Sequence, residues 1–208
     1  MMPHGLAKYL ELPLGARAPE EITVVVEIPR GSRNKYEYDK SLDVFRLDRA
    51  LHSPIHYPGD YGFAPQTHAL DDDPLDVLIL VSEPTFSGCI VMARPIGLLH
   101  MIDDGKVDDK ILAVPVGEPE YGDIHNYTQI FPHVLRKISH FFETYKSLEG
   151  KTTSINGWSD ASHARSTIVE ASMRYAAIHA TDITPPAPAL VSYLAPNGSN
   201  GDGASSNH

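Results

Sequence analysis

Two short acidic runs are the part of this sequence that could do chemistry. The first, residues 70–78, has aspartates at 71, 72, 73 and 76 around Pro74, and the second, residues 101–110, has aspartates at 103, 104, 108 and 109. Carboxylates this close repel one another, and a cleft holds them ionised only when cations neutralise them. Hard oxygen ligands without a Cys or His pair favour Mg²⁺ or Mn²⁺ over Zn²⁺ or copper. The two runs therefore predict a site for several metal ions.

The spacing within the first run favours convergence on one point. Asp71, Asp73 and Asp76 follow at steps of two and three in an irregular loop that enters an apolar segment. An EF-hand calcium loop is excluded, because its fifth and sixth positions would be Leu75 and Asp76 instead of a ligand and a glycine. A solvated acidic turn is the alternative for this run taken alone. The second run, with Lys110 directly behind it, favours the metal site.

Cations and phenols stand where a phosphate-binding partner of such metals would need them. Each could also be an ordinary surface or core residue. The candidates are Lys35, Arg49, Lys110 and Lys146, with Tyr57 and Tyr61 in a tight turn around Gly59 and with Tyr145 on a helix.

The elements that must position these residues are mostly short strands. Residues 22–28 are rich in β-branched side chains and stop at Pro29, and residues 35–39 and 44–48 predict a hairpin around the turn 40–43. Further strands are expected at 77–81, 89–93, 96–100 and 111–116. Many short strands separated by turns favour a closed or sandwiched β core.

Two amphipathic helices are expected to pack on this core. Apolar residues recur at steps of three and four over residues 134–148 and again over 164–178, the second helix entered through Ser159 as its N-cap. The fold class is therefore mainly β with flanking helices. Residues 1–182 are expected to form one domain. Residues 183–208, rich in Pro, Gly, Ser and Asn, are expected to be a disordered tail.

Composition excludes several classes of protein. The chain has 208 residues, 42% of them hydrophobic, and a formal net charge of −10, which opposes a sequence-independent grip on nucleic acid or on an anionic membrane. Neither a signal peptide nor a membrane span is recognisable, so a cytoplasmic location is expected. Cys89, the only cysteine, is expected to be a buried small hydrophobe. None of the 11 histidines forms an HExxH pair, which opposes zinc hydrolysis.

The motifs resemble, in order, those of family I soluble inorganic pyrophosphatases. The resemblance runs from about residue 24 to 175, and its most specific block is the first acidic run, DDDPLDVL. It implies an OB-like closed barrel of five strands with two main helices, and Mg²⁺-dependent hydrolysis of pyrophosphate to two phosphates. It also implies self-association, commonly as a homohexamer, with His125, His133 and His140 as candidate contact residues.

The resemblance also implies a role for each matching residue. Asp71, Asp76 and Asp108 correspond to ligands of the metals nearest the nucleophile, and Asp103 with Asp104 to ligands of metals that arrive with substrate. Asp73 corresponds to the general base, with Asp108 as the rival. Phosphate-binding positions are Lys35, Arg49, Tyr61, Lys110, Tyr145 and Lys146, and supporting positions are Glu27, Glu37 and Tyr57.

The sequence departs from the family pattern at two positions. Asp104 stands where many bacterial relatives have Glu, and Asp72 where Gly is frequent.

Two alternative functions stay open. The same site could hydrolyse another phosphoanhydride or a phosphoester. The barrel could instead be a non-catalytic OB-type binding module, which the acidic charge balance opposes.

Overall fold

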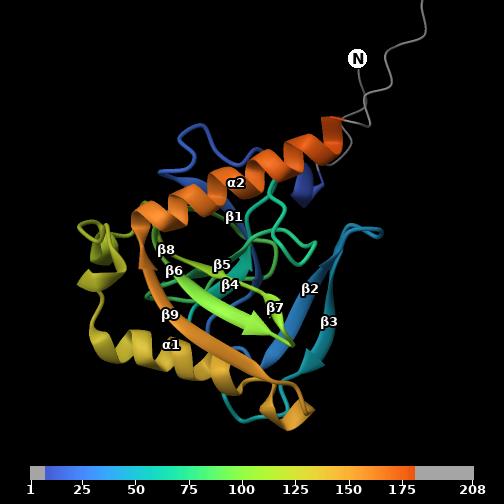
Figure 1. The fold of residues 1–208 in the computed structure, drawn as a ribbon, viewed down its shortest axis with the longest axis vertical. Coiled ribbons are helices and arrows are strands. Elements are labelled where there is room, and N and C mark those ends of the chain that lie inside the picture. Colours follow the sequence, from blue (N-terminus) through green and yellow to red (C-terminus); the bar gives the residue numbers. More distant parts are fainter. Residues whose placement is uncertain (1–7, 181–208) are drawn as a thin grey trace, which may run out of the picture.

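Five strands pair in a closed ring in the computed structural model of the protein, which describes residues 8–180. Going round the ring, β1 (Ile22–Ile28), β4 (Asp60–Phe63), β5 (Asp76–Ile79), β8 (Lys110–Pro115) and β6 (Ile90–Asp103) are neighbours, and β6 pairs again with β1 (Figure 1). Only the β5 and β8 neighbours in this ring run parallel. The predicted five-stranded closed barrel is confirmed in this form. The predicted tail, residues 183–208, lies outside the described residues.

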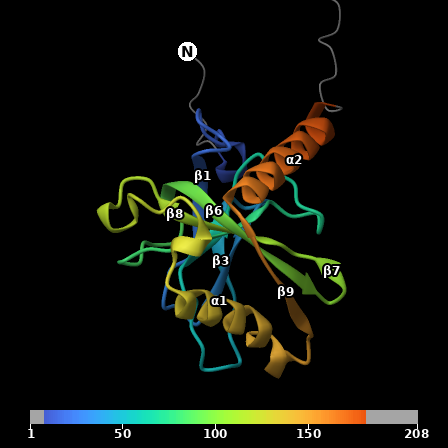
Figure 2. The same cartoon turned by 60° about the vertical axis from the view of Figure 1, so that its left-hand side comes forward.

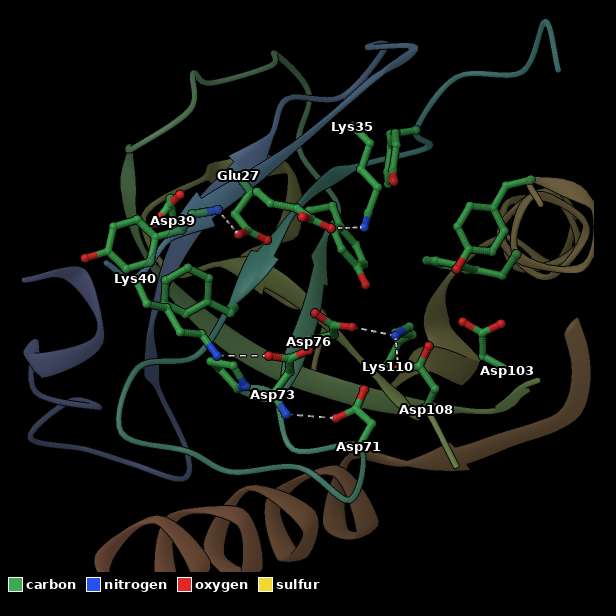
Figure 3. A pocket seen from close by; sticks show the side chains of 18 of the residues that line it. Glu27, Lys35, Asp39, Lys40, Asp71, Asp73, Asp76, Asp103, Asp108 and Lys110 are labelled. Carbon is green, nitrogen blue, oxygen red and sulfur yellow. Dashed lines mark hydrogen bonds and ion pairs between the residues drawn. The ribbon is translucent and has the colours of Figure 1, made fainter. Parts of the chain in front are cut away.

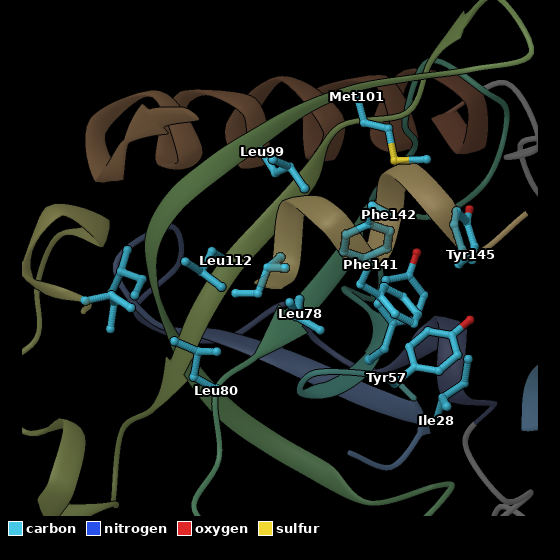
Figure 4. Packing of buried hydrophobic residues seen from close by; sticks show 14 of the residues in the cluster. Ile28, Tyr57, Leu78, Leu80, Leu99, Met101, Leu112, Phe141, Phe142 and Tyr145 are labelled. Carbon is cyan, nitrogen blue, oxygen red and sulfur yellow. The ribbon is translucent and has the colours of Figure 1, made fainter. Parts of the chain in front are cut away.

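Most of the ring strands are buried on both faces, which explains their continuous apolar runs. Leu78 and Leu80 face one core, shared with α1 (Pro132–Thr144). Val77 and Ile79 face a second core, shared with α2 (Ala161–Ala180). Figures 1 and 2 show the two helices on opposite sides of the ring, and Figure 4 shows Phe141 and Phe142 of α1 entering the first core. The two predicted helices are thus confirmed, each covering one core.

A hairpin and two further strands lie outside the ring. The hairpin β2 (Asn34–Asp39) and β3 (Val44–Ala50) forms a separate two-stranded sheet, as predicted. On the long strand β6, β7 (Lys106–Val107) and β9 (Thr153–Asp160) add further pairing. Short 3₁₀ turns occur at Tyr9–Glu11, Pro119–Tyr121, Tyr127–Gln129 and Ser147–Glu149.

Several strand predictions were wrong in detail. The strands predicted at 89–93 and 96–100 are one strand, β6, which begins at Ile90 and continues through an irregularity between Pro95 and Gly97. Strand β4 was missed because its short DYGF sequence resembles a turn. Its Gly62 lies so close to β1 that a Cβ atom there would stand 1.9 Å from the carbonyl oxygen of Val25. Glycine at this position therefore permits the ring to close.

Two helix predictions also need correction. Helix α1 ends at Thr144, so Leu148 lies in a following 3₁₀ turn and is 65% exposed. The carboxylate of Asp160, not Ser159, caps α2, because its Oδ1 atom accepts hydrogen bonds from the backbone N–H groups of Ser162 and His163 at 3.0 Å each. Ile178 is 46% exposed, whereas the predicted core positions Ala164, Ile168 and Ala171 are buried.

Cys89 is only partly buried, packed against the core shared with α2. Within residues 8–180, we find no helix long and apolar enough to cross a membrane.

Candidate active site

A cavity of about 590 Å³ opens where the hairpin, the acidic loop before β5 and the C-terminal end of α1 meet the ring. Figure 3 shows the carboxylates of both acidic runs pointing into it. The structure therefore brings together residues from β1, β2, β4, β5, β6 and β8. The predicted site residues that line the cavity are Glu27, Lys35, Glu37, Tyr57, Tyr61, Asp71, Asp73, Asp76, Asp103, Asp108, Lys110, Tyr145 and Lys146.

Lys110 is the cation at the centre of the acidic cluster. It is only 2% exposed, and its Nζ atom contacts the carboxylates of both Asp76 and Asp108 (Figure 3). Burial alone would lower the pKa of Lys110, but the two carboxylates outweigh burial and raise it. Lys110 is therefore charged, and it neutralises part of the cluster.

One ammonium cannot neutralise three neighbouring carboxylates. Burial raises the pKa of Asp108 to about 6, opposed by the Lys110 charge and supported by the negative charges of Asp76 and Asp71. Among the described residues, no three His, Cys, Asp or Glu side chains lie close enough together to hold a metal ion. The ammonium of Lys110 occupies the space between Asp76 and Asp108.

The second acidic run supplies a buried oxygen with no partner. Asp103 ends β6, and one of its carboxylate oxygens contacts Nζ of Lys146. Its other oxygen, Oδ1, is buried and has no hydrogen-bond partner. A buried unpaired carboxylate oxygen costs free energy. The candidate donors on the two sides of the cavity, this oxygen on one side and the carboxylates of Asp71, Asp76 and Asp108 on the other, are all oxygens, which suits hard divalent cations such as Mg²⁺.

Three phenols form the aromatic wall of the cavity. Tyr57 and Tyr61 lie next to each other, with ring centroids 5.5 Å apart, and Tyr145 stacks on Phe141 of α1 (Figure 4). Burial raises the pKa of all three tyrosines, and the nearby carboxylates raise it further. Their hydroxyls therefore stay protonated and can donate hydrogen bonds to phosphate oxygens.

Strands β1 and β2 supply the opposite wall. Glu27 accepts a hydrogen bond from the backbone N–H of Tyr38 at 2.8 Å, and loss of water raises the pKa of Glu27 to about 8. Lys35 contacts Glu37 and lies 3.5 Å from a carboxylate oxygen of Asp48. These contacts hold the Lys35 ammonium at the cavity.

Two predicted site residues are absent from the described lining of the cavity. The Arg49 guanidinium contacts Asp48 and lies 3.0 Å from the carboxylate of Glu149. Asp104 is exposed in the turn after β6, where one oxygen accepts a hydrogen bond from the backbone N–H of Thr152 at 3.3 Å.

Two charged residues of the cavity lining, Asp39 and Lys40, were not predicted from the sequence. Lys40, in the hairpin turn, lies with its Nζ atom 2.9 Å from Oδ1 of Asp73 (Figure 3). The sequence held a signal for Lys40, because it lies in the turn of the predicted hairpin that also carries the site residue Lys35.

Comparisons with known proteins agree with this geometry. The sequence model of one protein family, described as "Inorganic pyrophosphatase", matches residues 24–176. The inorganic pyrophosphatase of Methanosarcina mazei is 53% identical over 152 residues, which are 73% of this chain and 90% of that protein. That of Halalkalibacterium halodurans is 50% identical over 157 residues, 76% of this chain and 96% of that protein.

A solved structure shares the fold as well as the sequence. The crystal structure of inorganic pyrophosphatase from Thermus thermophilus superimposes with a TM-score of 0.77 at 42% identity, covering 79% of this chain and 96% of that chain. The family match covers more than half of the chain and includes both acidic runs. This chain therefore belongs to the family I inorganic pyrophosphatases, hydrolases that act on a phosphoanhydride bond.

Proposed function

We propose that this chain hydrolyses pyrophosphate to two orthophosphates with Mg²⁺ as its metal. The observation that carries the proposal is the cavity in which unneutralised carboxylates face the ammonium groups of Lys35, Lys110 and Lys146. Such a mixed lining suits a polyanion that binds together with divalent cations. The relatives named inorganic pyrophosphatase support the choice of pyrophosphate as the polyanion.

In this proposal Asp71, Asp76 and Asp108 hold metal ions on one side of the cavity, and Asp103 holds one on the other. Bound Mg²⁺ would neutralise the phosphate oxygens and lower the pKa of an attacking water. The buried, unpaired Oδ1 of Asp103 is a ready ligand. Lys110 would have to move away from Asp76 and Asp108, which frees its ammonium for a phosphate oxygen.

The remaining residues of the cavity bind and orient the substrate and move a proton. Lys35, Lys110 and Lys146 offset the negative charge that builds on the leaving phosphate. The neutral hydroxyls of Tyr61 and Tyr145 donate hydrogen bonds that fix its orientation. Asp73, whose side chain is 67% exposed, accepts the proton of the attacking water as general base.

Arg49 and Glu37 enter the proposal in weaker roles. Arg49 would have to leave Glu149 to reach a phosphate, so its predicted role is proposed only for the substrate-bound state. Glu37 holds Lys35 in place. We do not assign Asp104 to a metal, and its predicted role stays a prediction.

The experiment that tests the proposal measures phosphate released from pyrophosphate by the whole chain with Mg²⁺, with Mn²⁺ and with EDTA. We expect turnover that requires the metal, with Mg²⁺ the better activator. ATP and nitrophenyl phosphate are assayed in parallel at matched concentrations. Folded protein that releases no phosphate from pyrophosphate, or that prefers ATP, would contradict the proposal.

Self-association is proposed on the family resemblance alone, as a homohexamer. Light scattering coupled to size-exclusion chromatography gives the mass in solution. A monomeric mass would contradict it.

A further inference from the structure

The acidic strand that carries Asp108 and Lys110 is broken just before it enters the ring. Strand β7 ends at Val107 and β8 begins at Lys110, so residues 108 and 109 lie between two strands. The backbone N–H of Asp108 still donates to the carbonyl of Met101 on β6, at 2.9 Å. The N–H of Met101, however, donates to the side chain of Asp109, to Oδ1 at 3.1 Å. A side-chain carboxylate thus takes the place of a backbone carbonyl at the break.

The second oxygen of the same carboxylate is also held. Oδ2 of Asp109 lies 3.0 Å from Nδ1 of His100, and Nε2 of His100 lies 2.7 Å from Oγ of Ser159. A carboxylate only accepts hydrogen bonds, so Nδ1 of His100 carries a proton and donates it to Asp109, while Nε2 is hydrogen-bonded to the Ser159 hydroxyl. The chain of bonds ties β9 and β6 to the start of β8.

Asp109 lies between Asp108 and Lys110, the two residues of this segment that line the main cavity. Successive side chains of an extended segment point to opposite sides. Asp108 and Lys110 both line the cavity, and they contact each other. Asp109 between them contacts β6 instead. Fixing the carboxylate of Asp109 therefore fixes the direction in which Asp108 and Lys110 point.

We propose that Asp109, with His100 behind it, is a positioning residue that orients Asp108 and Lys110 for divalent metal and phosphate. The proposal rests on the proposed function of the cavity. Groups that hold a metal-binding side chain from behind typically change metal affinity by about 10- to 100-fold when removed. We expect a loss in that range when the carboxylate of Asp109 is deleted.

Ser159, His100 and Asp109 are hydrogen-bonded in the same order as the residues of a catalytic triad. The surroundings of Ser159, however, favour a supporting role for these three residues over a catalytic one. Asp160 follows Ser159 directly, and its carboxylate takes the N–H groups of Ser162 and His163. Those helix-start donors would otherwise be available to an oxyanion. Ser159 is not among the residues that line the cavity.

The test compares Asp109→Ala with Asp109→Asn. The asparagine retains Oδ1 as acceptor for Met101, and its amide can donate to Nδ1 of His100 after the imidazole proton moves to Nε2. Asp109→Asn therefore preserves the geometry while removing the charge. His100→Ala removes only the hydrogen bond to Oδ2 of Asp109 and leaves the one from Met101. This variant still tests the proposal if Asp109→Ala does not fold. Glu83→Ala, at an exposed position in the loop after β5, controls for loss of one negative charge.

Two readouts are taken on the whole chain: Mg²⁺ binding by calorimetry without substrate, and kcat and KM for pyrophosphate at several Mg²⁺ concentrations. We expect Asp109→Ala to bind Mg²⁺ about 10-fold more weakly or worse, His100→Ala to lose less, and Asp109→Asn and Glu83→Ala to remain near wild type.

Wild-type Mg²⁺ affinity in both Asp109→Ala and His100→Ala would overturn the proposal. So would equal losses in Asp109→Ala and Asp109→Asn, because the asparagine retains the hydrogen-bond geometry. A wild-type chain that binds Mg²⁺ but does not hydrolyse pyrophosphate would refute the proposed function instead, and the calorimetric comparison would still test the positioning of Asp108.

Discussion

The Nζ atom of Lys110 lies 2.5 Å from Oδ2 of Asp76, and the same ammonium also contacts Asp108. Lys110 begins β8 and Asp76 begins β5, and these two strands run parallel. The first residues of two parallel strands thus bring a buried cation and a carboxylate that we propose as a metal ligand to one point of the cavity. Without metal, the lysine is the counterion of the cluster. In the proposed function, metal and substrate would free its charge for the phosphate.

This relationship predicts that Lys110→Met destabilises the metal-free protein. Removing one partner of a buried ion pair leaves uncompensated charge, so we expect the free energy of unfolding to fall by about 3 kcal/mol in EDTA. Mg²⁺ should restore more stability to the variant than to the wild type, because it replaces the missing cation. Urea unfolding with EDTA and with Mg²⁺ measures both effects.

Lys106→Met is the matched control, since Lys106 is exposed on β7. It should change the free energy of unfolding by less than about 0.5 kcal/mol. Equal stability of the Lys110 variant and the wild type in EDTA would show that the ammonium does not neutralise the cluster.

Asp73→Asn tests the general base. The variant cannot take the proton of the attacking water, so kcat should fall by about 100-fold or more, while Mg²⁺ affinity stays near wild type. Stability should change little, because the side chain is 67% exposed. Steady-state kinetics and Mg²⁺ titration of the same preparation separate the two effects.

Asp72→Asn controls for charge in the same loop, because its side chain is 88% exposed and outside the described cavity lining. We expect near wild-type kcat from it. If Asp73→Asn retains wild-type kcat, Asp73 is not the base. A loss of kcat in Asp108→Asn that persists at saturating Mg²⁺ would then assign the role of base to Asp108.

Much of the site could be predicted because its residues lie in short, dense motifs. Residues 70–78 carry three of the carboxylates that line the cavity within six positions, so the local sequence is enough to predict an acidic site there. Strand β1 was equally plain, since five of its seven residues are Ile or Val.

The features that could not be predicted depend on contacts between distant segments. The direction of Arg49 is set by Glu149, 100 residues away, and no local pattern reports that ion pair. Strand β9 contains Gly157 at a positive φ of 107° and is polar at several positions, so it does not resemble a strand. It forms because β6 offers a long edge to pair with. Tertiary pairing overrides local propensity here.

Glu27 predicts a specific pH dependence of stability in the metal-free protein. Its pKa is 4.5 for the free side chain and about 8 in the folded protein. Between these values the folded chain holds a proton that the unfolded chain has lost. Unfolding then releases a proton, so stability falls as pH rises, by at most about 1.4 kcal/mol per pH unit for this one group.

Glu27→Gln removes that proton exchange and should flatten the profile. Its stability relative to the wild type should increase from pH 5 to pH 8 in EDTA, measured by urea unfolding. A difference that stays constant over this range would show that the Glu27 carboxyl titrates normally.

Asp103 and Asp104 are adjacent in sequence but differ in burial, and comparing them tests the metal site proposed at Asp103. Asp103 lines the cavity with a buried, unpaired oxygen, whereas Asp104 is exposed in the turn. Asp103→Asn should raise the Mg²⁺ concentration for half-maximal activity by about 10-fold or more. It should also reduce the Mg²⁺-induced thermal stabilisation, since a ligand stabilises only the state that binds it. Asp104→Asn tolerates the positive φ of 46° at that position and should leave both quantities near wild type. Equal losses in the two variants would instead place Asp104 among the metal ligands and require the turn after β6 to close over the bound substrate.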